Sequence, residues 1–226
     1  MYQTADRELA KIKSDLKREA VKLDNTGFDE LHATSVKTIT TRLMKRLKKK
    51  NYKAFWAVAY VAYADALKEA ERKGFDAEGE EIFELWLLDF LEKRLNPVTH
   101  YIYEPESERK RLRLSEALNT ALHYKDKSIM REEDKRFFNL WYTQTKQYMI
   151  DIVDGAETKA WEDVGVEYAK WVTAKDEKVC EECAPRDGKI YKLKDFPPKP
   201  HYNCRCRKVP MPKGWKPDKE NKQSED

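Results

Sequence analysis

The chain of 226 residues lacks any apolar stretch long enough to cross a membrane. Its longest apolar run, Ala54 to Ala64, holds eleven residues before Asp65, whereas a transmembrane helix needs about 20. The first twenty residues mix charged and apolar side chains and contain no apolar core of a secretory signal. We therefore expect a protein that begins in a cytoplasm and has no membrane partner.

Proline is scarce over most of the chain and concentrated near its end. Of the nine prolines, only Pro97 and Pro105 come before position 185. Because a proline inside a helix costs about 3 kcal/mol, the proline-poor part can form long helices and the last quarter cannot. All four cysteines also fall in this last part. We predict a helical body over residues 1–170, a cysteine-bearing module over 171–212 and a disordered polar tail over 213–226.

Apolar residues recur at helical spacing through the predicted body. The pattern predicts five helices, over about 4–23, 29–73, 77–95, 107–124 and 128–169. Gly74 follows Arg72 and Lys73 and is expected to end the second helix in a left-handed cap. This helix would be unusually long unless it kinks near Lys50 and Asn51. The third helix is apolar nearly all round, which indicates burial between neighbouring helices.

Five candidate metal ligands lie close together in the predicted module. Cys180 and Cys183 form a Cys-x2-Cys pair, and His201, Cys204 and Cys206 follow after seventeen residues. Such a pair and a second cluster at this spacing can close a tetrahedron around Zn²⁺. Zinc takes four ligands, and the spacing leaves open which four of the five these are. Four reduced thiols or two disulfides are the alternative, but a cytosolic chain rarely keeps disulfides and a short proline-rich segment needs another means of folding.

We expect one zinc ion per chain, with a structural role, because protein side chains can fill all of its positions. The His-x-Glu and Pro-Cys-x-x-Cys motifs of zinc deaminases and the His-Glu-x-x-His motif of metalloproteases are absent from the sequence. The sequence therefore predicts no enzyme, no catalytic residue and no small-molecule substrate. The predicted fold class is mainly α, an elongated helical body with long helices plus a small C-terminal zinc-stabilised β-hairpin module.

The segment from Gly165 to Pro210 resembles the C-terminal signature of the Mu F-like phage head morphogenesis proteins, a family of minor head proteins. The positions that carry the resemblance are Trp171, Asp176, Cys180, Cys183, Asp187, Gly188, Pro197, Pro198, His201, Asn203, Cys204, Arg205, Cys206 and Pro210. Tyr202 departs from the family, which usually has proline there. The resemblance implies that Trp171, Asp187, Gly188 and Arg205 shape the structure around the metal.

For function, the resemblance implies a minor head protein of a tailed bacteriophage that acts in head morphogenesis at or near the portal inside the procapsid. A link to DNA packaging or ejection is also implied. The expected partners are the portal protein and capsid or scaffold proteins. The expected location is the interior of the virion head, after assembly in the host cytoplasm. The alternatives are a zinc-ribbon regulator that binds nucleic acid and a metal-dependent hydrolase or toxin carried on a head protein.

Non-specific double-stranded DNA is a further candidate partner. The candidate phosphate contacts form one basic run, Lys45, Arg46, Lys48, Lys49, Lys50 and Lys53, with aromatic residues beside it. Arg205, Arg207 and Lys208 flank the metal candidates, where they can contact phosphate or balance thiolate charge. The net charge of +4 is too small for a dedicated nucleic-acid coat. A solvated helix face is the alternative for the basic run.

Overall fold

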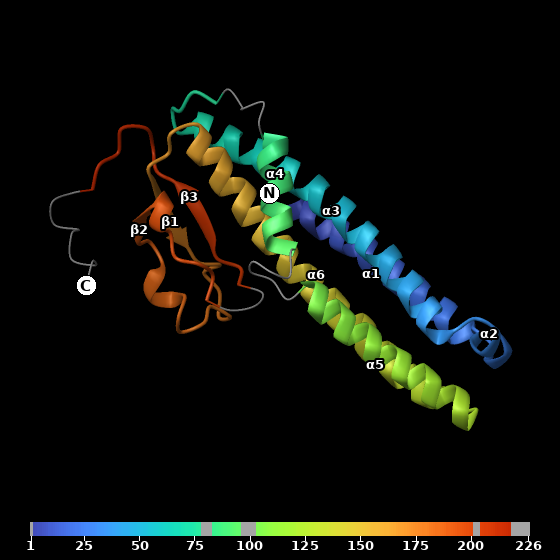
Figure 1. Cartoon of the computed structure of the whole chain (residues 1–226). Helices are drawn as coiled ribbons and strands as arrows, with labels where there is room; N and C mark the ends of the chain where they lie inside the picture. Colours follow the sequence, from blue (N-terminus) through green and yellow to red (C-terminus); the bar gives the residue numbers. More distant parts are fainter. Residues whose placement is uncertain (1, 78–82, 96–102, 201–203, 218–226) are drawn as a thin grey trace. The chain divides into compact units, whose positions relative to one another are not determined.

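The computed structural model describes residues 2–77, 83–95, 103–200 and 204–217 (Figure 1). The helices are α1 (Tyr2–Asn25), α2 (Phe28–Ala33), α3 (Val36–Arg72), α4 (Phe83–Leu95), α5 (Tyr103–Tyr124) and α6 (Lys127–Asp163). The strands are β1 (Tyr168–Val172), β2 (Ile190–Lys192) and β3 (Arg207–Pro210). The predicted fold class, mainly α with a small C-terminal β module, is confirmed. Within the described ranges, none of the helices combines the length and the apolar character that a membrane span requires.

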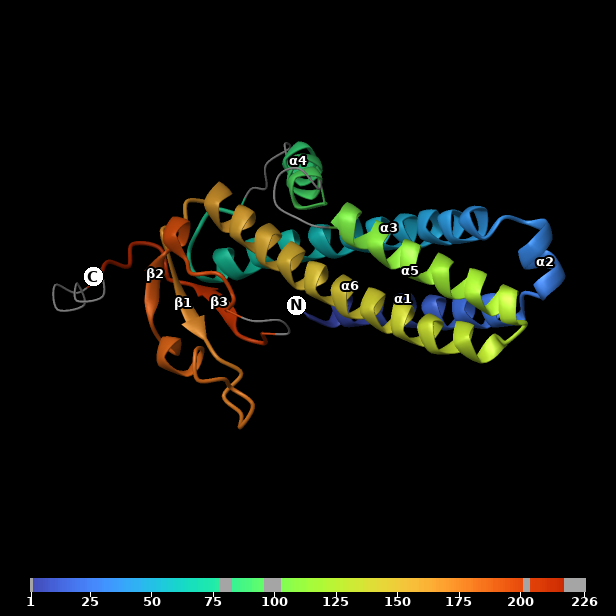
Figure 2. The same cartoon turned by 60° about the horizontal axis from the view of Figure 1, so that its bottom comes forward.

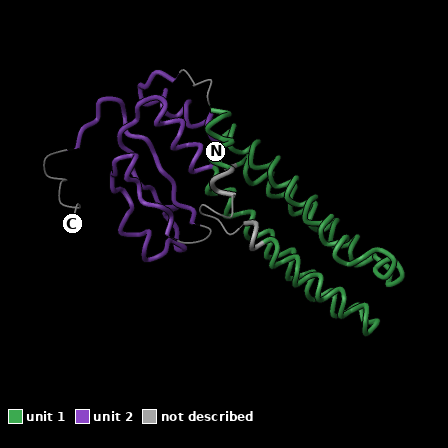
Figure 3. Tube along the Cα trace, viewed as in Figure 1, with its two compact units in different colours: residues 1–61, 82–152 green, residues 62–81, 153–226 purple. Residues whose placement is uncertain are grey.

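The chain divides into two compact units (Figure 3). Unit 1 consists of residues 1–61 and 82–152, and unit 2 consists of residues 62–81 and 153–226. Unit 2 therefore contains the last turns of α3 and α6 in addition to the sheet. The domain ranges drawn from the sequence, with boundaries after residues 170 and 212, stay a prediction. Residues 218–226 of the predicted tail lie outside the described residues.

The predicted second helix is wrong in one respect, because α2 and α3 are separate helices. Thr34 between them is extended, with φ −105° and ψ 109°. The carbonyl of Ser35 accepts the first bonds of α3, from the N–H groups of Thr38 (2.7 Å) and Ile39 (3.1 Å). Threonine and serine form helices poorly in the interior and favour the ends. Helix α3 continues without a break through Lys50 and Asn51, the place where a kink was considered.

Two glycines end the long helices. Gly74 has φ +87°, and the N–H of Phe75 donates to the carbonyl of Ala70 at 3.2 Å, which confirms the predicted cap of α3. The last helix was predicted to run to about residue 169, and this is wrong because α6 ends at Asp163. Gly165 has φ +77°, and the N–H of Val166 bonds to the carbonyl of Trp161 at 2.8 Å. The same type of cap thus ends α6, and the chain continues into β1.

Helix α4 differs from its prediction in start and burial. Ala77, the expected first residue, is not helical, the helix is described from Phe83, and residues 78–82 lie outside the described part of the chain. Leu87 and Leu91 are buried, but Leu85 is 68% and Leu88 46% exposed. The expected burial all round is therefore wrong, because α4 packs one face only.

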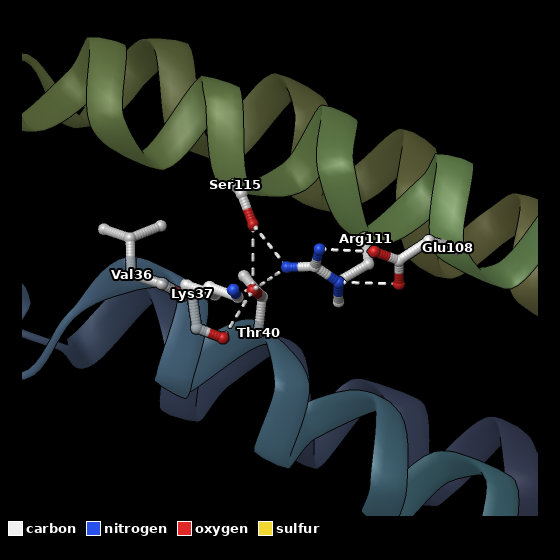
Figure 4. A network of polar contacts seen from close by, with 6 residues as sticks. All are labelled: Val36, Lys37, Thr40, Glu108, Arg111 and Ser115. Carbon is white, nitrogen blue, oxygen red and sulfur yellow. Dashed lines mark hydrogen bonds and ion pairs between the residues drawn. The ribbon is translucent and has the colours of Figure 1, made fainter.

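In unit 1, segments of α1, α3, α5 and α6 lie side by side as long helices (Figure 2). Their apolar stripes form the core, which includes Leu16, Phe55, Leu118 and Trp141. Polar contacts fix neighbouring helices within this core. Figure 4 shows one between α3 and α5, where the hydroxyl of Thr40 lies 2.8 Å from that of Ser115 and accepts from Arg111 at 3.4 Å.

The sheet of unit 2 has three antiparallel strands in the order β2-β1-β3. Ala169 in the central strand pairs with Tyr191 on one side and with Pro210 on the other. The sheet thus has one strand more than the predicted hairpin. Its central strand carries Trp171, and β3 begins directly after Cys206. This topology brings the two cysteine segments together.

Candidate metal centre

Three cysteines that are separated in the sequence form one buried cluster in unit 2. The sulfur atoms of Cys183, Cys204 and Cys206 all lie within 4.8 Å of one another, and those of Cys183 and Cys204 are 3.6 Å apart. Each of the three residues is at most 4% exposed. Among the described residues this is the only group of three or more histidine, cysteine and acidic ligands that can hold a metal ion.

Cys180 lies at the edge of this cluster. Its side chain is half-buried, packs against the three cysteines and interacts with the thiol of Cys183. No disulfide joins any of the four cysteines. His201, the fifth candidate ligand, lies outside the described residues. The structure therefore brings together four of the five predicted candidates, all of them cysteines.

A tight turn positions the first cysteine pair. The carbonyl of Cys180 accepts the N–H groups of Cys183 at 3.1 Å and of Ala184 at 3.0 Å. The chain then passes through a 3-10 turn over Ala184–Arg186 and reaches the predicted Asp187-Gly188 turn. These bonds explain why a Cys-x2-Cys spacing places its two sulfurs close to each other.

The Asp187-Gly188 turn joins this segment to the central strand. One carboxylate oxygen of Asp187 accepts the N–H (2.8 Å) and the hydroxyl (3.0 Å) of Thr173. These bonds hold the pKa of Asp187 below its usual value. Gly188 has φ +79°, a conformation that favours glycine, and its N–H donates to the carbonyl of Trp171 at 2.9 Å. Both residues thus set the path of the chain from the cysteine turn into β2.

Arg205, between the two last cysteines, is paired with a carboxylate. Its guanidinium donates to the two carboxylate oxygens of Asp176 at 2.5 and 2.7 Å. The hydrogen bonds from Arg205 lower the pKa of Asp176. This bidentate pair ties the segment that leads to Cys180 to the segment that carries Cys204 and Cys206. The family resemblance implied that Arg205 shapes the structure around the metal, but the sequence did not identify Asp176 as its partner.

The thiols are in a setting that disfavours their charged form unless a cation is present. Burial raises the pKa of Cys183 and of Cys206. The indole N–H of Trp171 is buried and has no acceptor at hydrogen-bond geometry in the described part of the chain. Its interaction with Cys206 lowers the pKa of that thiol and so offsets a small part of the increase caused by burial. An N–H group of this kind fits a sulfur that carries negative charge. The donor set of buried thiols fits a thiolate-binding ion such as zinc.

Aromatic rings cover the cluster. Trp171 stacks on Phe196 with ring centroids 5.6 Å apart and planes inclined by 8°. Tyr191 meets Phe196 edge-on at 5.4 Å, and the guanidinium of Arg186 lies 5.2 Å from the Trp171 ring. These rings shield the sulfurs from water.

The sequence interpretation missed a contribution from α6. Lys199 forms an ion pair with Asp154, and Lys208 bonds to the carbonyl of Asp154 and the hydroxyl of Thr158. No motif links these α6 residues to the cysteines, because they lie in a helix far from them in the sequence. The only available signal was the presence of lysines on both sides of the last cysteines.

The basic run on α3 divides into two sets. Arg46 pairs with Glu19 at 2.7 Å and Lys50 with Asp15 at 3.2 Å, so these two side chains are turned toward α1. Lys48 is half-buried and engaged in an electrostatic interaction with Glu108. The remaining three side chains are exposed and four residues apart, and they are Lys45, Lys49 and Lys53. These three form one stripe along the helix.

Comparison with known proteins gives one result for this segment of the chain. Residues 139–209 match the family model described as Phage Mu protein F like protein. The match confirms the resemblance based on the cysteine signature and extends it into α6. It covers less than half of the chain. No curated protein and no solved structure gives a significant match.

Proposed function

We propose that this chain, which carries a Phage Mu protein F like segment, is a minor head protein of a tailed bacteriophage that acts in head morphogenesis at or near the portal. The observation that supports this most is the extent of the match, since residues 139–209 include Trp171 and all four cysteines. The portal protein and capsid or scaffold proteins are the proposed partners. The proposed location is the head interior, with a link to DNA packaging or ejection.

The proposed metal is one structural zinc ion. Cys183, Cys204 and Cys206 would hold it, and Cys180 is the proposed fourth ligand because its thiol adjoins that of Cys183. When bound, zinc supplies a cross-link between the cysteine turn and the segment before β3. A catalytic zinc keeps an open position for substrate, whereas these three side chains are buried. Burial therefore favours a structural role and supports a protein without enzyme activity.

In this proposal each group around the cysteines has a mechanical task. Asp187 and Arg205 hold the two cysteine segments at their turns, through Thr173 and Asp176. Trp171 covers the sulfurs and presents its N–H toward Cys206. The result is a small rigid surface, stabilised by a metal in place of a large apolar core, that suits docking to another protein.

The function is tested by following the protein through head assembly. Procapsids are purified from cells that produce the phage, with the wild-type gene or with the Cys183→Ser variant, and their protein content is measured by quantitative mass spectrometry. We expect a low and constant copy number of the wild-type chain per head, and fewer copies of the variant. Absence of the wild-type chain from procapsids and virions would refute the proposed function.

A second candidate activity is non-specific binding of double-stranded DNA by Lys45, Lys49 and Lys53. The observation that favours it is their exposed stripe on α3. Replacing all three by glutamine is expected to weaken binding and to reduce the slope of log affinity against log salt by about 0.9 per lost phosphate contact. The matched control replaces the exposed residues Lys189, Lys192 and Lys194 of unit 2. An equal effect of both triple variants would argue against a specific stripe.

A further inference from the structure

Two lysines flank the segment that carries the last two cysteines. Lys199 lies five residues before Cys204, and Lys208 lies two residues after Cys206. Both side chains reach the same turn of α6 in unit 2, where the acceptors come from Asp154 and Thr158. One turn of α6 thus contacts the chain both before and after Cys204 and Cys206.

The contacts at this place are specific. The ammonium group of Lys199 lies 3.0 Å from a carboxylate oxygen of Asp154. Lys208 donates to the main-chain carbonyl of Asp154 at 3.0 Å and to the hydroxyl of Thr158 at 2.5 Å. That hydroxyl also donates to the carbonyl of Asp154 at 2.7 Å. One residue of α6 therefore serves both lysines, through its side chain and its main chain.

The charges of this network are largely removed from water. The Lys199 and Asp154 side chains are 10% and 19% exposed. Glu157, one turn away, is 1% exposed, and burial followed by the charge of Asp154 raises its pKa to about 8. The carboxylate of Asp154 is therefore the main source of negative charge beside the two lysines. Removal of one partner of a buried ion pair leaves the other charge uncompensated, so substitution of either Lys199 or Asp154 is unfavourable.

A chain of contacts leads from α6 to the sulfurs. The ammonium group of Lys208 lies 5.6 Å from the ring of Phe196, which stacks on Trp171. Trp171 in turn belongs to the buried cluster with Cys183, Cys204 and Cys206. A displacement of Lys208 would thus change the packing of the rings that cover the metal ligands.

From these contacts we infer that Asp154 and Thr158 are positioning residues of the metal centre, which anchor Lys199 and Lys208 and so set the placement of Cys204 and Cys206. The inference rests on the metal site of the proposed function and adds α6 to it. A metal-binding segment whose two sides are anchored loses less freedom when it binds the ion. Residues that hold metal ligands indirectly commonly change metal affinity by 10- to 100-fold when substituted.

The test measures Zn²⁺ affinity of the full chain by competition with a chromogenic chelator, and the cysteine coordination by the absorption of the Co²⁺-loaded chain. The Asp154→Asn variant is expected to bind Zn²⁺ about tenfold more weakly than the parent chain, with one ion per chain retained. Thr158→Val, which removes a hydroxyl but no charge, is expected to weaken binding less. Glu132→Gln is the matched control, because it removes an exposed carboxylate from the same helix, far along α6 from Asp154.

Thermal melting separates a positioning role from a purely structural one. If Asp154 positions the ligands, zinc raises the melting temperature of Asp154→Asn by less than it raises that of the parent chain. An equal increment in both, together with equal Zn²⁺ affinity, would overturn the inference. If Asp154→Asn does not fold, Zn²⁺ affinity and the zinc-induced increase in melting temperature are measured for Thr158→Val and Lys199→Met instead. Values equal to those of the parent chain in both variants would overturn the inference. Absence of zinc binding by the parent chain would refute the metal site itself, whereas normal binding by all variants refutes only the role of α6.

Discussion

A buried carboxyl group in unit 1 predicts a pH dependence of stability. Asp134 on α6 is 4% exposed, and neither of its carboxylate oxygens has a hydrogen-bond partner among the described residues. Burial, followed by the negative charges of Asp24 and Glu133, raises its pKa from 3.8 to about 7. We predict that Asp134→Asn stabilises the protein at pH 8 and has little effect at pH 4.

The sign and size follow from the difference between the folded and the unfolded state. Because the folded pKa is raised, the folded state binds the proton more tightly, and the stability present below about pH 4 is lost as the pH rises toward 7. Each unit of pKa difference corresponds to about 1.4 kcal/mol, so the loss is at most roughly 4 kcal/mol. Relaxation of the site reduces this figure, and we expect a gain of about 2 kcal/mol for the variant at pH 8.

The assay is urea unfolding followed by circular dichroism from pH 4 to pH 8.5, for the parent chain and the variant. Only the difference between the two chains is interpreted, since other groups titrate equally in both. Glu132→Gln, an exposed residue of the same helix, serves as the control and is expected to show a flat difference. A loss of stability with Asp134→Asn that is the same at pH 4 and pH 8 would refute this electrostatic explanation.

Further predictions concern the metal, a helix end and a buried contact. Cys183→Ser is expected to lower zinc from about one ion per chain to almost none by elemental analysis and to increase proteolysis within unit 2. Gly165→Ala is expected to cost about 1 kcal/mol in urea unfolding because of its positive φ. Gly27→Ala, at φ −72° on the N-cap of α2, is expected to cost less, because it involves no left-handed backbone. Asn51→Ala breaks a buried 2.7 Å bond to Thr145 and is expected to cost about 2 kcal/mol. A double-mutant cycle with Thr145→Val measures the coupling, and its absence would contradict the proposed contact.

Local signals in the sequence determined the helices and several of their ends. The apolar spacing of α1 and the left-handed Gly74 are properties of neighbouring residues, and both were predicted. The break before α3 and the stop at Gly165 also depend on local chemistry, but Ser35 and Gly165 sit in patterns that continue the helical spacing on either side. Burial of α4 was misjudged because Leu85 and Leu88 carry no information about whether a neighbour covers them.

The cysteine spacing alone determined that a metal site was expected, since a Cys-x2-Cys turn and a following cluster restrict the possible chemistry. Only the tertiary structure decided that Cys183, Cys204 and Cys206 converge and that Arg205 binds Asp176. It also decided that Asp154 of α6 holds the flanking lysines. A sequence motif relates residues that are close together in the chain. Contacts between distant segments depend on how helices and strands pack, and a motif does not contain that information.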